Sequence, residues 1–190
     1  MNNIDEMKKE CGDKLNNTLL QYGYKFIDLC DNTYKNGKYV YMVSDKDGNK
    51  FVCKQYHQCS YSISWKRTKE IHKELEELNI GPKIREFLDK ERICVMECGY
   101  KTFFHYANND KVKERVTNMI DVLHENKYIH GDLHEYNIMI REDDTPFLID
   151  FESTIKWGKD DISTIYGSKE LSTFEDLVKF DLRTLKKYIF

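Results

Sequence analysis

Proline, excess charge of one sign and long apolar runs are all scarce in this chain. Its 190 residues include 2 prolines and carry a formal net charge of −3. Proteins that bind nucleic acid or membrane surfaces usually present a basic face, so this balance gives no support for either role. No apolar run approaches the roughly 20 residues that span a bilayer, and the first residues lack the apolar segment of a secretory signal.

Cysteine spacing is equally uninformative about metals. The 6 cysteines form no CxxC pair and show no spacing typical of zinc ligands. Several lie in apolar, strand-like runs, where a free cysteine behaves as a small hydrophobic residue. We therefore expect a reducing, cytoplasmic location. With 40% hydrophobic residues and no low-complexity linker, the chain is long enough for one domain or two small lobes.

The first half is predicted to be rich in strands. A short polar helix over 3–22 precedes them, and an Asp-Gly turn after Asp45 indicates a hairpin. A helix over Ser64–Asn79 carries an apolar stripe and is stopped by Gly81 and Pro82. The strands are expected at Tyr24–Leu29, Tyr39–Val43, Lys50–Tyr56, Lys83–Leu88 and Arg92–Glu97.

The second half is predicted to be mainly helical. Lys111–Tyr128 has apolar residues at i, i+4, i+7, i+8 and i+11, the period of a helix that packs on one face. Two short strands follow at Ile138–Ile140 and Phe147–Ile149, and a last helix spans Thr173–Tyr188. We expect a two-lobed α+β fold: a single domain with a β-rich lobe over 1–98 and a truncated helical lobe over 99–190.

One segment carries most of the candidate chemistry. Asp132, Asn137 five residues later and Asp150 thirteen residues after that stand among apolar, strand-like runs. Asp132 can accept a hydrogen bond, and late in the reaction a proton, from an attacking hydroxyl. Asn137 and Asp150 supply the oxygen ligands that magnesium prefers. Any one of these residues could simply stabilise a turn, but together they indicate phosphoryl transfer.

The same segment resembles the eukaryotic-like kinase superfamily. His130-Gly131-Asp132 stands where protein kinases have HRD, Asn137 matches the catalytic-loop asparagine, and Asp150-Phe151-Glu152 replaces DFG. The form of these motifs is similar to the atypical branches, among them the lipopolysaccharide-core, KEOPS-type and RIO-like kinases. The resemblance implies a protein-kinase-like fold, ATP and Mg²⁺ as cofactors, and a hydroxyl acceptor.

The resemblance also implies roles upstream. Phe51-Val52-Cys53-Lys54 resembles the VAIK strand, so Lys54 would contact the α- and β-phosphates; a solvated strand lysine is the alternative. The glutamate that pairs with this lysine should lie on the next helix. Glu70 has the family's usual distance to the helix end, whereas Glu74 lies nearer the apolar stripe. We favour Glu70, although either could be a solvated helix charge.

The expected adenine pocket involves five further positions. Val95–Gly99 resembles the hinge of kinases, with Met96 as gatekeeper and backbone groups of Glu97 and Gly99 facing adenine. Met139 would form the floor of the purine pocket and Val52 its roof. Ordinary strand cores contain the same residue types.

Asp181 lies on the apolar stripe of the last predicted helix. A carboxylate on a buried face is costly unless donors satisfy it. Kinases carry such an aspartate to brace the backbone of the catalytic loop, so the resemblance gives Asp181 a structural role. The alternative is that Asp181 tilts toward solvent.

The sequence departs from the family in several places. The expected glycine-rich loop, residues 31–37, has a single glycine, although several glycines normally let backbone N–H groups approach phosphate. His134 stands in the place of a lysine near the γ-phosphate, and Glu152 replaces the DFG glycine. Only 38 residues follow Glu152, which leaves no APE motif and no room for a conventional peptide-binding region.

Three functions remain in competition. The first is an active kinase whose acceptor is a protein serine or threonine, a glycan or a small molecule, with a protein partner possible. The second is a pseudokinase that binds nucleotide or regulates a partner. The third is a metal-dependent hydrolase, because His130, Asp132 and His134 alternate like metal ligands. The remaining histidines, His57, His72, His105 and His124, are expected at the surface.

Overall fold

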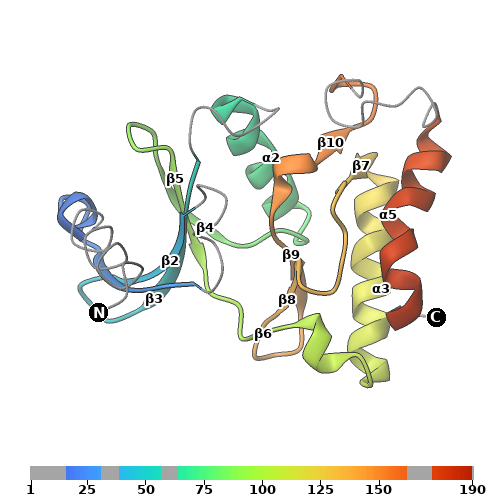
Figure 1. The fold of residues 1–190 in the computed structure, drawn as a ribbon, viewed down its shortest axis with the longest axis horizontal. Coiled ribbons are helices and arrows are strands. Elements are labelled where there is room, and N and C mark those ends of the chain that lie inside the picture. Colours follow the sequence, from blue (N-terminus) through green and yellow to red (C-terminus); the bar gives the residue numbers. More distant parts are fainter. Residues whose placement is uncertain (1–15, 31–38, 57–63, 162–172, 190) are drawn as a thin grey trace, which may run out of the picture. The chain divides into compact units, whose positions relative to one another are not determined.

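A computed structural model of the chain describes residues 16–30, 39–56, 64–161 and 173–189 (Figure 1). By internal contacts the chain divides into two compact units. Unit 1 comprises Met1–Ser60 and Lys83–Cys98, and unit 2 comprises Tyr61–Pro82 and Gly99–Phe190. The predicted fold class is confirmed, since the N-terminal part is rich in strands and the C-terminal part is helical. The division into lobes 1–98 and 99–190 of one domain stays a prediction.

Unit 1 contains an antiparallel five-stranded sheet in the order β1-β2-β3-β5-β4. The predicted Asp-Gly turn between β2 and β3 is present: Gly48 adopts a φ of 83°, and its N–H donates to the carbonyl oxygen of Asp45. All five predicted strands are found, within one or two residues at each end. They are β1 (Lys25–Leu29), β2 (Tyr39–Ser44), β3 (Lys50–Gln55), β4 (Ile84–Leu88) and β5 (Ile93–Glu97).

One face of this sheet packs on the apolar core of unit 1. Cys53 on β3 stands opposite Tyr41 on β2 and Val95 on β5, and all three belong to the apolar core of unit 1 with Leu19 and Tyr24. Side chains alternate between the faces of a strand. The residues before and after Cys53 therefore point to the other face of the sheet.

Among its described residues, unit 2 contains the α-helices α2 (Trp65–Glu77), α3 (Asp110–Glu125) and α5 (Phe174–Ile189). α2 begins at an N-cap, where the Ser64 hydroxyl accepts from the Arg67 N–H, and it ends before Asn79, whose φ is 58°. α3 buries its predicted apolar stripe, and it contacts α5 (Figure 1). α2 contributes Ile71 and Leu75 to the same core as α3.

Short strands and turns connect these helices. A three-stranded sheet has the order β6-β8-β9, and a two-stranded sheet pairs β10 with β7. The elements are β6 (Lys101–Thr102), the 3₁₀ helix η2 (Phe103–Tyr106), β7 (Tyr128–Ile129), β8 (Ile138–Ile140), β9 (Pro146–Leu148), the 3₁₀ helix η3 (Phe151–Ser153) and β10 (Ile155–Lys156).

Several predicted boundaries in the second half of the chain differ from the observed ones. The helix expected to reach Tyr128 ends at Glu125, because Lys127 has a φ of 64° and Tyr128 already pairs in β7. The strand expected at Phe147–Ile149 begins one residue earlier, since Pro146 pairs with Ile140. Of the helix predicted over 3–22, residues 16–20 are helical and residues 1–15 lie outside the described ranges.

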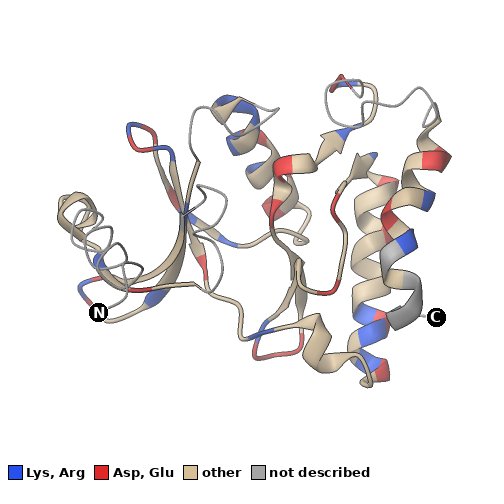
Figure 2. Ribbon diagram, viewed as in Figure 1, with Lys and Arg blue, Asp and Glu red and all other residues tan. Residues whose placement is uncertain are grey.

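Charged residues of both signs occur throughout the described parts of the chain (Figure 2). Figure 2 shows lysine and arginine together with aspartate and glutamate in both units. Within the described ranges, no helix is both long and apolar enough to cross a bilayer. None of the four cysteines there, Cys30, Cys53, Cys94 and Cys98, takes part in a disulfide.

There is no room for a side chain at Gly99, where the second segment of unit 2 begins. A methyl group there would lie 2.8 Å from Cβ of Met139 and 3.2 Å from the Phe147 ring. We expect Gly99→Ala to lower the free energy of unfolding by about 1–3 kcal/mol, the usual cost of overpacking. Urea unfolding measures this loss. Cys98→Ala, at an exposed neighbouring position, is the matched control, and equal losses in the two variants would contradict the expectation.

Candidate functional site

A buried carboxylate fixes the start of the predicted catalytic loop. Asp181 on α5 is 2% exposed. Its Oδ2 accepts from the His130 N–H at 2.8 Å, and its Oδ1 accepts from the Gly131 N–H at 2.8 Å. Nε2 of His124 lies 3.2 Å from Oδ2. The predicted bracing role of Asp181 is therefore confirmed, and a position tilted toward solvent was wrong.

The side chain of His130 connects this loop to the segment that carries Asp150. Its Nδ1 accepts from the Asp132 N–H at 3.3 Å, so the ring proton sits on Nε2, which lies 2.9 Å from the carbonyl oxygen of Ile149. Burial lowers the pKa of His130, and this outweighs the opposing influence of the nearby Asp181. His130 is thus a neutral imidazole that joins two backbone segments.

Asp132 and Asn137 lie together in the loop. The Asn137 amide nitrogen donates to the Asp132 carbonyl oxygen at 2.9 Å and to its Oδ2 at 3.3 Å. Asn137 is buried, whereas the Asp132 carboxylate is exposed. A carboxylate in this position can accept a hydrogen bond from an incoming hydroxyl.

The β8–β9 hairpin brings Asn137 and Asp150 to one end. Ile138 pairs with Leu148, and the Ile149 N–H donates to the carbonyl oxygen of Asn137 at 3.0 Å. Both bonds of the Asn137 side chain use its nitrogen. Its amide oxygen and the Asp150 carboxylate are ligands of the kind that Mg²⁺ takes with substrate phosphates. These residues therefore fit a magnesium ion.

The structure gives no support to the metal-dependent hydrolase hypothesis. That hypothesis required His130 as a ligand, but both ring nitrogens of His130 are engaged with backbone groups. Among the residues that the structure describes, no group of three or more histidines, cysteines, aspartates and glutamates could hold a metal ion.

His134 lies beside Asp132, at the position where kinases have a lysine. Nε2 of His134 is 3.7 Å from Oδ2 of Asp132, and its Nδ1 accepts from the Tyr136 N–H at 3.2 Å. The Tyr136 ring stacks on Phe104 of η2 with 5.2 Å between ring centroids, and both rings are exposed. The surface next to Asp132 is therefore aromatic.

Three predicted residues of unit 1 share one face of its sheet. Val52 pairs with Met96, and Lys54 lies two residues beyond Val52 on the face opposite to Cys53. Lys54 is 6% exposed, with its ammonium group 5.2 Å from the centroid of the Tyr56 ring. A solvated strand lysine was therefore the wrong alternative. The contacts of Val52, Lys54 and Met96 with nucleotide stay predictions.

The two hinge positions belong to different units. Glu97, in unit 1, makes two hydrogen bonds with the backbone of Lys83. Its N–H donates to the Lys83 carbonyl oxygen, and its carboxylate accepts from the Lys83 N–H. Gly99, in unit 2, lies against Met139. The predicted adenine contacts of Glu97, Gly99 and Met139 stay predictions.

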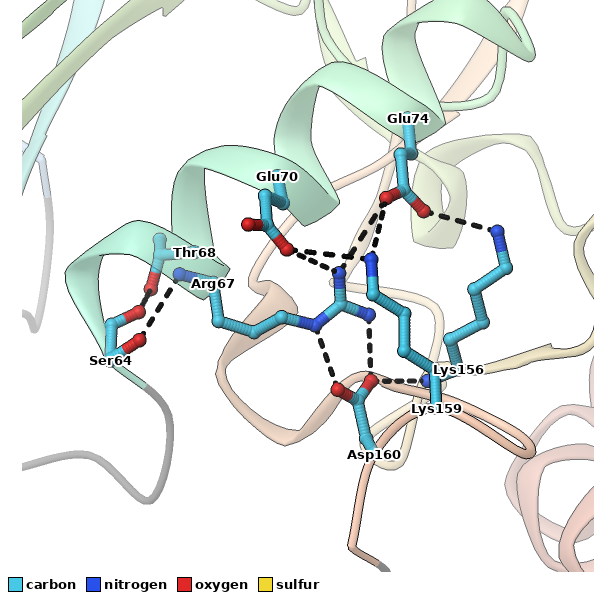
Figure 3. Close-up of polar contacts among 8 residues, drawn as sticks. All are labelled: Ser64, Arg67, Thr68, Glu70, Glu74, Lys156, Lys159 and Asp160. Carbon is cyan, nitrogen blue, oxygen red and sulfur yellow. Dashed lines mark hydrogen bonds and ion pairs between the residues drawn. The ribbon is translucent and has the colours of Figure 1, made fainter.

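The two candidate glutamates of α2 take part in a polar network within unit 2 (Figure 3). Glu70 contacts Arg67 and Lys159 at 3.4 Å each. Glu74 contacts Lys156 and Lys159 at 3.2 Å each and Arg67 at 3.7 Å. Burial raises the pKa of Glu74, but hydrogen bonds from the two lysines outweigh this and lower it. Lys54 belongs to unit 1, and its pairing with Glu70 or Glu74 stays a prediction.

Several residues at this site carried no recognisable sequence signal. The buried Thr154 hydroxyl donates to the His130 carbonyl oxygen at 3.2 Å. His72 packs edge-on to Phe151 with 4.9 Å between ring centroids. His72 and His124 are buried, so their predicted surface position was wrong, whereas that of His105 is confirmed. The loop over 31–37 and His57 lie outside the described residues.

Removing the Asp181 carboxylate leaves two buried backbone donors and His124 without their acceptor. We expect Asp181→Ala to lower the free energy of unfolding by about 3 kcal/mol, because unsatisfied buried donors are costly. Denaturant unfolding measures the loss. Glu175→Ala, at an exposed position of the same helix, should stay within about 0.5 kcal/mol of the parent. Similar losses in both variants would show that Asp181 does not brace the loop.

The neutral state of His130 predicts a dependence of stability on pH. Its pKa is lower in the folded protein than the ordinary value of 6.5. Below about pH 6.5 the unfolded chain therefore binds a proton that the folded chain does not, and stability falls with falling pH. We expect a smaller fall between pH 7 and 5 in His130→Asn, measured by denaturant unfolding. Exposed His105→Asn should retain the parent slope; an unchanged slope in His130→Asn would refute this origin.

Comparison with known proteins agrees with this geometry. The family model of the RIO domain matches residues 84–165, a range that includes Asp132, Asn137 and Asp150. A search among curated proteins found no match. RIO domains form an atypical protein-kinase-like family, and such a domain implies an ATP-binding phosphotransferase. Over residues 84–165 this chain is therefore similar to the RIO domain, which confirms the predicted resemblance to RIO-like kinases.

Proposed function

We propose that this protein transfers the γ-phosphoryl group of Mg²⁺-ATP to a hydroxyl acceptor. The observation that carries the proposal is the position of Asn137. Its side chain bonds to Asp132, and its carbonyl oxygen bonds to the residue before Asp150. The candidate base and both candidate metal ligands are thus linked within the segment that matches the RIO domain. Phosphoryl transfer depends on such positioning more than on covalent chemistry.

Each residue of the loop has a separate task. The Asp132 carboxylate accepts a hydrogen bond from the acceptor hydroxyl and orients its oxygen toward phosphorus. Asn137 and Asp150 hold Mg²⁺, which neutralises phosphate charge when it is bound. His134 lies beside Asp132 on the acceptor side. The acceptor is a protein serine or threonine, or a hydroxyl of a glycan or small molecule.

The remaining proposed contacts with ATP involve Lys54, Val52, Met96 and Glu97 of unit 1 and Gly99 and Met139 of unit 2. Lys54 binds the α- and β-phosphates. Its side chain is buried, and a buried ammonium group interacts more strongly with phosphate charge than one surrounded by water. Val52 and Met139 contact the purine ring from either side, Met96 is the gatekeeper, and the backbone groups of Glu97 and Gly99 bond to adenine. The common sheet face of Val52, Lys54 and Met96 supports this assignment.

Glu70, rather than Glu74, is proposed to pair with Lys54. Glu74 accepts bonds from two lysines at 3.2 Å, and the lowered pKa shows that its charge is stabilised there. Glu70 is more exposed and has longer contacts of 3.4 Å. Less interaction energy is therefore lost when Glu70 exchanges partners.

Asp132→Asn should abolish most of the activity while preserving binding. The amide retains the size of the side chain but cannot accept a proton, and loss of a general base typically costs about 10²–10⁴-fold in rate. Incubation with labelled ATP and Mg²⁺ measures autophosphorylation and ATP hydrolysis. The shift in melting temperature with a non-hydrolysable ATP analogue measures binding, and we expect it to be retained.

Asp121→Asn, at an exposed aspartate on α3, is the matched control and should keep parent activity. Analogue binding without any turnover in the parent protein would favour the pseudokinase alternative. Turnover that persists in Asp132→Asn would contradict the role of Asp132.

A further inference from the structure

A bidentate ion pair joins α2 to the segment that follows Asp150 (Figure 3). Nε of Arg67 donates to Oδ1 of Asp160 at 2.8 Å, and Nη2 donates to Oδ2 at 2.6 Å. The Arg67 side chain is 11% exposed and that of Asp160 is 16% exposed. Two parallel charge-assisted bonds fix direction as well as distance, so this pair sets how the segment lies on the helix.

Four further charges surround the pair. On α2, Glu70 contacts Lys159, and Glu74 contacts both Lys156 and Lys159. Both glutamates also contact Arg67. We refer to Arg67, Glu70, Glu74, Lys156, Lys159 and Asp160 as the ionic clasp. Its three cations balance its three anions. A network of this kind orders its members together, which an isolated surface pair does not.

The segment's side of the clasp is a closed turn. Oδ2 of Asp160 accepts from the Lys156 N–H at 2.7 Å, while the N–H groups of Lys159 and Asp160 both donate to the Lys156 carbonyl oxygen at 3.0 Å. Gly158 has a φ of 80°, which permits the turn. The clasp therefore binds a turn, residues 156–160, whose backbone conformation is held by its own hydrogen bonds.

The near end of the same segment also rests on α2. Phe151 follows Asp150 directly, and its ring contacts His72 of α2 with 4.9 Å between centroids. Asp150 itself has φ 66° and ψ 63°, in the left-handed region. Such a conformation is unfavourable for a residue with a side chain and persists only where the surroundings hold it. Between them, Phe151 and the clasp hold the chain just beyond Asp150 at two points.

We propose that Arg67 is a positioning residue for Asp150. By fastening the segment to α2 through Asp160, it maintains the left-handed conformation of Asp150 and thus the place of the carboxylate at the metal. The proposal rests on the proposed function for the metal-binding role of Asp150. It adds that part of the metal affinity depends on a residue of α2 that touches neither metal nor nucleotide.

The test uses Arg67→Gln, Asp160→Asn and the double variant in the full chain. Calorimetric titration of a non-hydrolysable ATP analogue at several Mg²⁺ concentrations gives the Mg²⁺ concentration for half-maximal binding. We expect each single variant to raise it about tenfold, the lower end of the usual loss when support of a metal ligand is removed. The double variant should be no worse than either single one, because both changes remove the same pair.

Hydrogen exchange of the metal-free protein supplies a second measurement. Amides of residues 151–161 should exchange faster in Arg67→Gln and Asp160→Asn than in the parent. Lys113→Gln is the matched control, since it removes a cation from an exposed i,i+3 pair on α3. It should leave both measurements unchanged.

The outcomes separate this proposal from the proposed function. A parent protein that binds the analogue with Mg²⁺ but does not turn over ATP contradicts the function and still tests the clasp. Variants that bind with parent Mg²⁺ dependence overturn the clasp proposal, even if they melt at a lower temperature, because a purely structural role would do the same. A parent that shows no Mg²⁺-dependent binding overturns both.

Discussion

The candidate site depends on the hydrogen bonds that the buried carboxylate of Asp181 accepts from the loop backbone. This carboxylate accepts bonds from the backbone of His130 and Gly131 and contacts His124 of α3. A charge with so little exposure is tolerated only when donors compensate it, so α5, α3 and the loop must keep one relative arrangement. His130 extends this constraint, because its ring links Asp132 with Ile149. One carboxylate thus determines the backbone on which Asp132 and Asp150 stand.

Two uncharged interactions connect the loop to the segment around Asp150. The β8–β9 pairing places Asn137 next to Ile149, and the Phe151 ring lies near both His130 and His72. Phe151 is fully buried, so its contacts help to fix the rings of His72 and His130. Hydrogen bonds to the backbone also fix the ring of His130. The neutral state of His130 suits this place, because burial disfavours the charged ring more than the nearby Asp181 favours it. Electrostatics and packing therefore favour the same conformation.

The sequence predicted the long elements because they depend on local patterns. The apolar period of α3 and the Asp-Gly turn after Asp45 need no knowledge of the fold. Asp181 was found because a carboxylate interrupts an apolar stripe. The strands β6, β7 and β10 have two residues each and are held by their partners, so they leave no periodic signal. The same applies to Thr154 and His124, whose roles depend on residues far away in the chain.

The ionic clasp shows why charged residues on a helix are difficult to interpret from sequence. Arg67, Glu70 and Glu74 have the spacing of ordinary solvated i,i+3 and i,i+4 charges, which contribute little to stability. Asp160, 93 positions after Arg67, makes them a network together with Lys156 and Lys159. An apolar contact could hold α2 and the segment with similar strength, since desolvation offsets much of an ion pair's attraction. Apolar surfaces, however, can slide, whereas a bidentate pair permits one register. We infer that the clasp contributes geometry more than stability, as the proposed positioning of Asp150 requires.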